Sequence, residues 1–236
     1  MAKQVYECNW VPSRVTEDQL DDLVLIGALG SKDTIHWRAP GKECPPTPQE
    51  GEVVVFVDHL ARGFKPPGSK FYRDVLANFQ LHPQDTGPNS VTNMCHFQVL
   101  CEVFFQEEPT VELFRDCFHL NRRTEFTDGS NTELGGVAIQ KRKEVTYPHA
   151  KLHSHPKEWN QTWFYCKDTS PAGENPLPGF RPERLSNTHP FPQRLSAKER
   201  SKYAPQLSKL RAFMANGLTG VDLARCWISW SILPLI

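Results

Sequence analysis

The sequence has no excess of charge of either sign. Among its 236 residues, 27 Lys and Arg balance 27 Asp and Glu, which gives a formal net charge of zero. This balance excludes the strongly basic class of nucleic-acid-binding proteins. Any affinity for phosphate groups must therefore come from a local cluster of basic side chains.

Long apolar runs are also missing. No stretch approaches the roughly 20 apolar residues that cross a bilayer, and the most apolar segment, residues 226–236, is about half that length. The N-terminal sequence MAKQVYECNW has no apolar run of the kind found in signal peptides. The seven cysteines are odd in number and irregularly spaced, which favours reduced thiols over a disulfide framework. We therefore expect an intracellular protein without a membrane partner, either nuclear or cytoplasmic.

The familiar signatures of catalysis are missing as well. The sequence has no G-x-S-x-G element, no Walker-type glycine loop and no C-x2-C pair. Asp85-Thr86-Gly87 matches the D-[ST]-G triplet of aspartic proteases, but proline-containing loop sequence flanks it between two expected helices, where a turn is the simpler interpretation. We predict a protein that is not an enzyme, with no cofactor and no small-molecule substrate.

A zinc site is the other chemical alternative. Its ligands would be Cys166 with the three histidines of one short segment, His149, His153 and His155. The H-x3-H spacing brings two imidazoles to one face only on a helix, and Pro148 and Pro156 leave too little room for one. We predict polar loop histidines and no metal, and leave their role open.

Periodicity and capping signals predict a helix-dominated first unit over residues 15–125. A capping box at Thr16 begins a helix over 17–29 that Gly30 ends, and Ser69 caps another helix. The remaining expected elements are a buried strand over 53–57, a long helix from Ser90 to before Pro109, and a helix over 111–118. The strand is expected to pack against these helices.

The remainder of the chain divides into three parts. Residues 126–169 are expected to form a small β or irregular region, with a turn at 127–129 and strands within 133–141 and 162–166. Residues 170–195 are rich in proline, which predicts an extended linker. Residues 196–236 form a C-terminal helical segment with capping residues Ser196 and Thr219. The predicted fold class is α+β.

Two local basic clusters are candidates for phosphate contact. They are Arg122 with Arg123, and Lys141 with Arg142 and Lys143. Such runs are usually solvated faces, and the neighbouring Glu144 reduces the local positive charge. A basic segment over 194–211 is likewise either a phosphate contact or a solvated face.

The order of several short motifs resembles a known family. The motifs are WRAPG at 37–41, GEVVVF at 51–56, RGF at 62–64, PNS at 88–90 and FQVLCEVF at 97–104, followed by WFY at 163–165 and LTGVDL at 218–223, with the ILPL tail at 232–235. In this order they resemble the plant gypsy-type transposon, or transposase-like, domain family. The resemblance covers residues 15–125 well and the remainder more thinly.

The resemblance implies a retroelement-derived protein, but no acidic triad of a transposase or integrase can be carried onto this sequence. The apolar framework without a catalytic constellation predicts a non-catalytic structural or interaction module, gag-like or self-associating. The alternative is a nucleic-acid-binding domain that uses Arg122, Arg123, Lys141, Arg142 and Lys143. Family members tend to continue past the Leu-Pro-Leu segment, so a truncated element copy is also expected.

Overall fold

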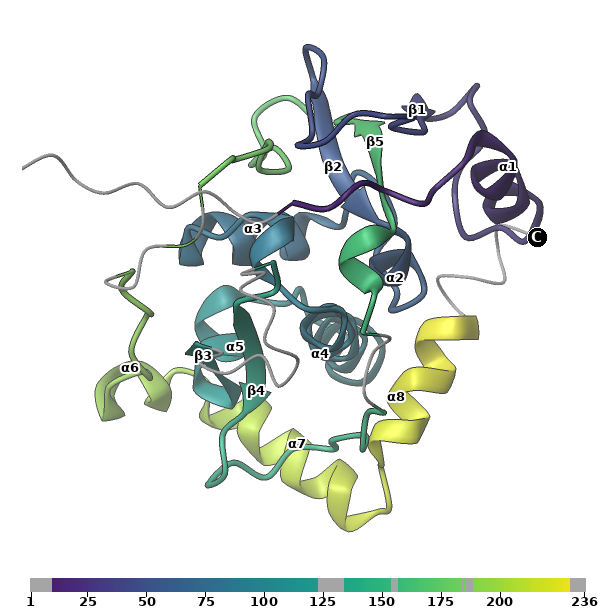
Figure 1. Ribbon diagram of the computed structural model, residues 1–236. Helices are drawn as coiled ribbons and strands as arrows, with labels where there is room; N and C mark the ends of the chain where they lie inside the picture. The colour runs from purple at the N-terminus through teal and green to yellow at the C-terminus, as the bar shows by residue number, and fades with distance from the viewer. Residues whose placement is uncertain (1–9, 123–133, 154–156, 184, 186–188, 230–236) are drawn as a thin grey trace, which may run out of the picture.

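The computed structural model describes residues 10–122, 134–153, 157–183, 185 and 189–229 (Figure 1). The helices in these ranges are α1 (Glu17–Leu25), α2 (Val57–Leu60), α3 (Lys70–Phe79), α4 (Pro88–Val99), α5 (Val111–Cys117), α6 (Ala197–Ser201), α7 (Ala204–Ala215) and α8 (Gly220–Trp227). The strands are β1 (Trp37–Arg38), β2 (Glu52–Phe56), β3 (Phe118–Arg122), β4 (Val137–Lys141) and β5 (Trp163–Lys167). The predicted α+β class is confirmed.

Side-chain caps set the helix starts that the sequence predicted. Thr16, Ser196 and Thr219 each form a complete capping box, and the Ser69 hydroxyl accepts from the Tyr72 backbone N–H. The expected end of the first helix at residue 29 is wrong. The helix ends at Leu25, because the chain turns through Gly27 in the left-handed region, at φ 69°.

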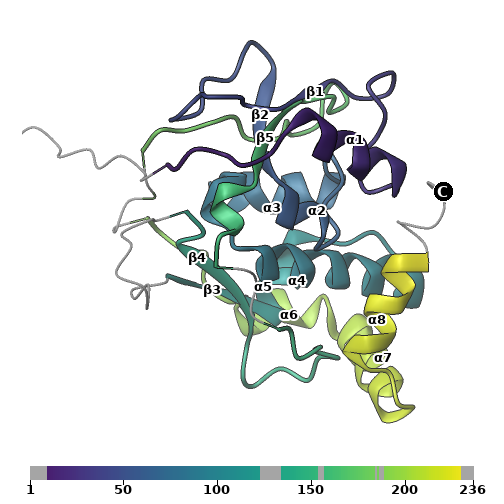
Figure 2. The same ribbon diagram turned by 45° about the vertical axis from the view of Figure 1, so that its right-hand side comes forward.

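Helix α4 lies at the centre of the molecule, between the three-stranded sheet and α7 (Figures 1 and 2). It begins with Pro88 in its first turn, two residues before the expected start, and continues as a π-helical turn over Leu100–Phe105. It contacts α2, α3, β4 and α8. Because these neighbours cover α4 on several sides, most of its residues are buried.

The three-stranded sheet joins distant parts of the sequence. Its order is β1-β5-β2, with both pairs antiparallel, so β5 is the central strand. In the register, Val54 pairs with Tyr165 and Phe56 with Trp163. Residues 53–57 and 162–166 were both expected to form strands, and they pair with each other. A second antiparallel sheet consists of β3 and β4 alone.

The described part of the proline-rich segment, residues 170–183, 185 and 189–195, lies along the helical body and is called the strap below. Leu177 and Leu185 are buried, so the strap contributes to the core. Arg73 of α3 donates from Nε to the backbone oxygen of Asn175 at 2.8 Å and pairs with Glu174. Burial and these hydrogen bonds hold the strap against the helical body.

Helix α8 packs against α4 through the fully buried Leu223. Trp227 of α8 lies over Gly63, which has a φ of 102°, and a Cβ added at Gly63 would lie 2.4 Å from the indole Nε1. Glycine at this position therefore permits the close approach of α8. None of the helices in the described ranges has the length and apolar character that crossing a bilayer requires.

Candidate nucleic-acid interface

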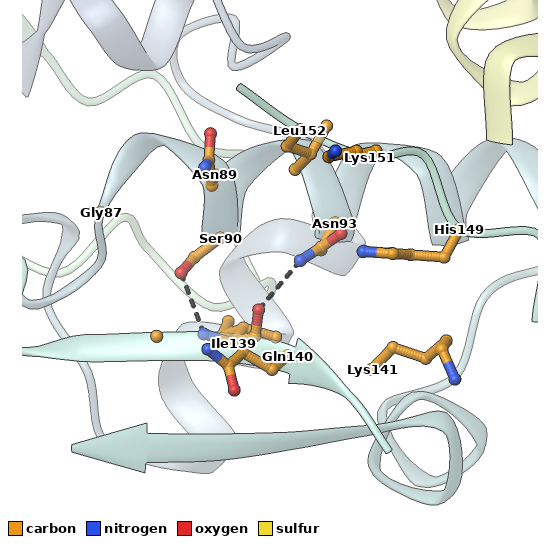
Figure 3. Close-up of a pocket in the computed structure, with 11 residues that line it drawn as sticks. Gly87, Asn89, Ser90, Asn93, Ile139, Gln140, Lys141, His149, Lys151 and Leu152 are labelled. Carbon is orange, nitrogen blue, oxygen red and sulfur yellow. Dashed lines mark hydrogen bonds between the residues drawn. The ribbon is translucent and has the colours of Figure 1, made fainter. Parts of the chain in front are cut away.

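A groove with a volume of about 510 Å³ lies between α4, β4 and the segment over residues 149–152 (Figure 3). This volume lies within the range of about 300 to 1,000 Å³ that is common for ligand-binding pockets. Its lining is Gly87, Asn89, Ser90, Asn93, Ala138, Ile139, Gln140, Lys141, His149, Lys151 and Leu152. The lining contains three basic side chains and no carboxylate.

One wall of the groove is a junction between α4 and β4. The Ser90 hydroxyl accepts from the backbone N–H of Ile139 at 3.0 Å, and Asn93 Nδ2 donates to the backbone oxygen of Ile139 at 2.9 Å. Two helix side chains therefore bond the backbone groups that a further strand would otherwise bond. This fixes the position of β4 relative to the first two turns of α4 (Figure 3).

Another wall of the groove is the segment over residues 149–152, which contacts the start of α8. A Cβ added at Gly220 would lie 2.1 Å from the backbone nitrogen of Ala150, so the helix backbone packs directly on this segment. Asn89 Nδ2 also donates to the backbone oxygen of His153 at 3.1 Å. Together these contacts hold the segment that carries His149 and Lys151 against α4 and α8.

The basic side chains of the groove differ in how far contacts within the protein occupy them. Lys141 Nζ donates to the backbone oxygens of Arg142 at 2.9 Å and Val145 at 3.0 Å, so much of its donor capacity holds the turn after β4. Lys151 is exposed. Partial burial and then the charge of Lys141 lower the pKa of His149, which makes its imidazole neutral at pH 7.

A second histidine lies close to the groove, on α4. His96 is buried, and burial together with its neighbour His149 lowers its pKa to about 4. It therefore carries no charge near neutral pH. The positive charge of the groove at pH 7 comes from its two lysines.

The structure separates the basic residues that the sequence grouped. Arg122 lies over the ring of Phe191, 5.5 Å from its centroid, and Arg123 lies outside the described residues. Arg142 donates from Nε to the backbone oxygen of Arg115 at 3.1 Å, and Lys143 is exposed. Of the four predicted residues that the structure describes, Lys141 is the one that lines the groove.

Two arginines of the basic segment over 194–211 form ion pairs within the protein. Asp116 of α5 is buried and accepts from Arg194 Nε at 2.9 Å and from Arg200 Nε at 3.0 Å. Arg194 also pairs with Glu144 at 3.0 Å. These arginines fasten the end of the strap and α6 to the helical body, which reduces the positive charge they offer to a ligand.

Sequence reasoning missed Lys151 and Asn93 as parts of a site. Lys151 stands alone between Ala150 and Leu152, so no local cluster marks it. The histidines considered for zinc include His149, which lines the groove, and His155, which lies outside the described residues. Among the described residues, no three metal-ligating side chains come together.

The protease-like triplet is part of the packed body. Asp85 is 2% exposed, pairs with Arg181 at 2.5 Å and accepts from the backbone N–H of His82 at 2.8 Å. Burial raises its pKa, and the guanidinium of Arg181 opposes this shift. The backbone oxygen of Thr86 lies 3.1 Å from His59 Nε2. The triplet ends a short 3-10 turn before α4 and does not follow a strand.

Comparison with known protein families gives a match over one segment of the chain. Residues 53–122 match the family model described as "Putative gypsy type transposon". This confirms the resemblance to gypsy-type transposon sequences over that segment. Comparisons with curated proteins and with solved structures gave no match.

The segment that matches the gypsy-type family model runs from β2 to the end of β3. It therefore includes the α4 wall of the groove. The β4 wall and the segment over 149–152 lie outside the match.

Proposed function

We propose that this chain is a non-catalytic module of gypsy-type transposon origin that binds the phosphodiester backbone of nucleic acid at the groove between α4, β4 and residues 149–152. The observation that carries the proposal is the charge of the lining. Lys141 and Lys151, with His149 between them in sequence, line a groove without a carboxylate, although the whole chain is formally neutral. A local positive field of this kind attracts phosphate.

The proposal assigns no reaction to the groove. Its lining has polar amides, a hydroxyl that is bonded to β4 and basic groups, which suit binding and positioning. Asp85, the residue that most resembled a catalytic acid, is buried in an ion pair with Arg181 on the strap. A carboxylate held in this way supports packing of the strap.

The test is a titration of fluorescent oligonucleotides, followed by anisotropy, across a salt series. Two lysines that neutralise two phosphates predict a slope of about −1.4 in log K against log salt for a single strand, or about a sevenfold loss of affinity between 50 and 200 mM salt. Lys151→Gln is expected to remove about 0.7 of that slope. Lys141 is a poorer target because it also holds the turn over residues 142–145.

Lys42→Gln is the matched control. Lys42 is exposed in the loop between β1 and β2, so this substitution changes the net charge equally but lies outside the groove. The control is expected to keep the slope and affinity of the parent protein. Equal losses in both variants, or binding that is indifferent to salt, would contradict the proposal.

We propose self-association as a second candidate function, carried by a different observation. Val221 and Ile228 are 52% and 48% exposed, and their spacing of two helical turns puts them on one face of α8, away from the buried Leu223. Such a face suits a second copy of the chain. Light scattering should then show a dimer that the double substitution Val221→Glu and Ile228→Glu converts to a monomer; a monomeric parent protein would end this candidate.

A further inference from the structure

Asn93 forms part of the groove wall, and its side chain is fixed in one orientation. The residue is 6% exposed, and its Nδ2 donates to the backbone oxygen of Ile139 at 2.9 Å. Since a carbonyl oxygen can only accept, the amide cannot turn over without losing this bond. Its Oδ1 is therefore turned away from β4 and lies on the side of His149 (Figure 3). The groove combines a recessed hydrogen-bond acceptor with cationic groups.

A phosphate group does not match this combination, because at neutral pH it offers acceptors and no useful donor. A nucleotide does match it. Its phosphates complement Lys141 and Lys151, and the Watson–Crick edge of its base carries an N–H donor for Asn93 Oδ1. The cavity of about 510 Å³ is large enough for one such unit.

The recessed position of Asn93 discriminates between single and double strands. In a duplex, the Watson–Crick edges are paired and the bases lie inside the helix, so a base cannot enter a recess in a protein surface. In a single strand, an unstacked base can be splayed out toward the protein. The shape of the groove therefore favours single strands.

We propose that the groove takes one unstacked nucleotide of a single strand, with the base edge at Asn93 and the flanking phosphates at Lys141 and Lys151. This inference rests on the proposed function, since it names the form of nucleic acid that the same groove would bind. The base contact supplies affinity that is independent of salt, and the phosphate contacts supply the part that depends on salt.

The experiment varies the ligand and leaves the protein unchanged, so altered folding cannot explain a difference. Three DNA ligands of about 12 nucleotides are compared by anisotropy over about 50 to 200 mM salt: a single strand, the same strand with its bases removed, and a duplex. We expect the single strand to bind about tenfold more tightly than the duplex. Removing the bases should cancel this advantage and leave the salt slope unchanged, because the slope reports phosphate contacts.

The outcomes separate the inference from the function on which it rests. Equal binding of single strand and duplex, or undiminished binding of the strand without bases, would overturn the inference while salt-dependent binding still supported the proposed function. No salt-dependent binding of any of the three ligands would overturn both. A tenfold preference that disappears with the bases would support both.

Discussion

Arg181 on the strap and Asp85 on the helical body form an ion pair at 2.5 Å, although 96 positions separate them in the sequence. Gln84 completes the junction: its Nε2 donates to the backbone oxygen of Arg181 at 2.7 Å, and its Oε1 accepts from the backbone N–H of Arg181 at 3.3 Å. Both the side chain and the backbone of Arg181 are therefore bound. This junction gives the D-T-G triplet a structural explanation.

The first prediction concerns the stability of this junction. Asp85→Ala leaves the Arg181 guanidinium without its carboxylate in a largely buried place, so we expect the free energy of unfolding to fall by about 3 kcal/mol. Urea unfolding followed by circular dichroism measures this loss. The exposed Asp33→Ala is the control, with an expected change within about 0.5 kcal/mol.

A double-mutant cycle isolates the pair itself. Combining Asp85→Ala with Arg181→Ala should cost less than the sum of the two single changes, because each single change already breaks the same pair. Strict additivity would show that the two side chains do not interact.

The second prediction is a dependence of stability on pH through Glu43. Burial opposes its ionisation, but hydrogen bonds from Thr47, Tyr165 and Arg38 outweigh burial and lower the pKa of Glu43 from 4.5 to about 2. The folded state therefore binds this proton less readily than the unfolded state. Its contribution is complete above pH 4.5 and is lost as the pH falls toward 2.

Acid unfolding of Glu43→Gln tests this contribution. The Glu43 side chain is 32% exposed, so after solvent screening we expect about 1 to 2 kcal/mol of the stability at pH 7 to depend on its charge. The variant should be less stable at pH 7 and should lose less stability than the parent protein between pH 5 and 2. Parallel stability curves for the two proteins would contradict the assignment.

Local signals made the start of several helices predictable. Four capping side chains accept hydrogen bonds from backbone groups within the next few residues: Thr16, Ser69, Ser196 and Thr219. Because donor and acceptor are close in the sequence, a short sequence window is enough to predict the cap. Strand pairing has no such local signal. The pairing of β2 with β5 joins residues more than 100 positions apart, and only tertiary packing places β5 between β1 and β2.

The sequence indicated Lys141 as a phosphate contact and His149 only as a zinc ligand, and it did not indicate Lys151 or Asn93. Lys141 belongs to a visible basic run, whereas Lys151 lines the same groove from a segment on which Gly220 of α8 packs directly, a contact between distant parts of the sequence. Arg142, from the same run, bonds a backbone oxygen at the end of α5. An arginine in a basic run can satisfy a helix carbonyl or bind a phosphate, and composition does not distinguish the two.

The third prediction concerns Gly220, which sets the position of that groove wall. A methyl group at this position meets the backbone of His149 and Ala150 at 2.5 and 2.1 Å, so either α8 or the segment must move. We expect Gly220→Ala to lower the free energy of unfolding by about 1 to 3 kcal/mol and to weaken oligonucleotide binding through displacement of Lys151. Gly179→Ala is the control because nothing lies within 4 Å of its added Cβ. Unchanged binding and stability in Gly220→Ala would show that this contact does not position the wall.

The last prediction is a dependence of binding on pH through His149. Burial and Lys141 lower its pKa below the ordinary value of 6.5, so it is neutral at pH 7 in the free protein. A bound phosphate stabilises the imidazolium, hence binding takes up a proton and affinity should rise as the pH falls from 8 to 5.5. The neighbouring His96, with its pKa of about 4, stays neutral over this pH range. Anisotropy titrations at constant ionic strength should show this rise for the parent protein and a flat profile for His149→Gln; a rise that persists in the variant would exclude His149 as its source.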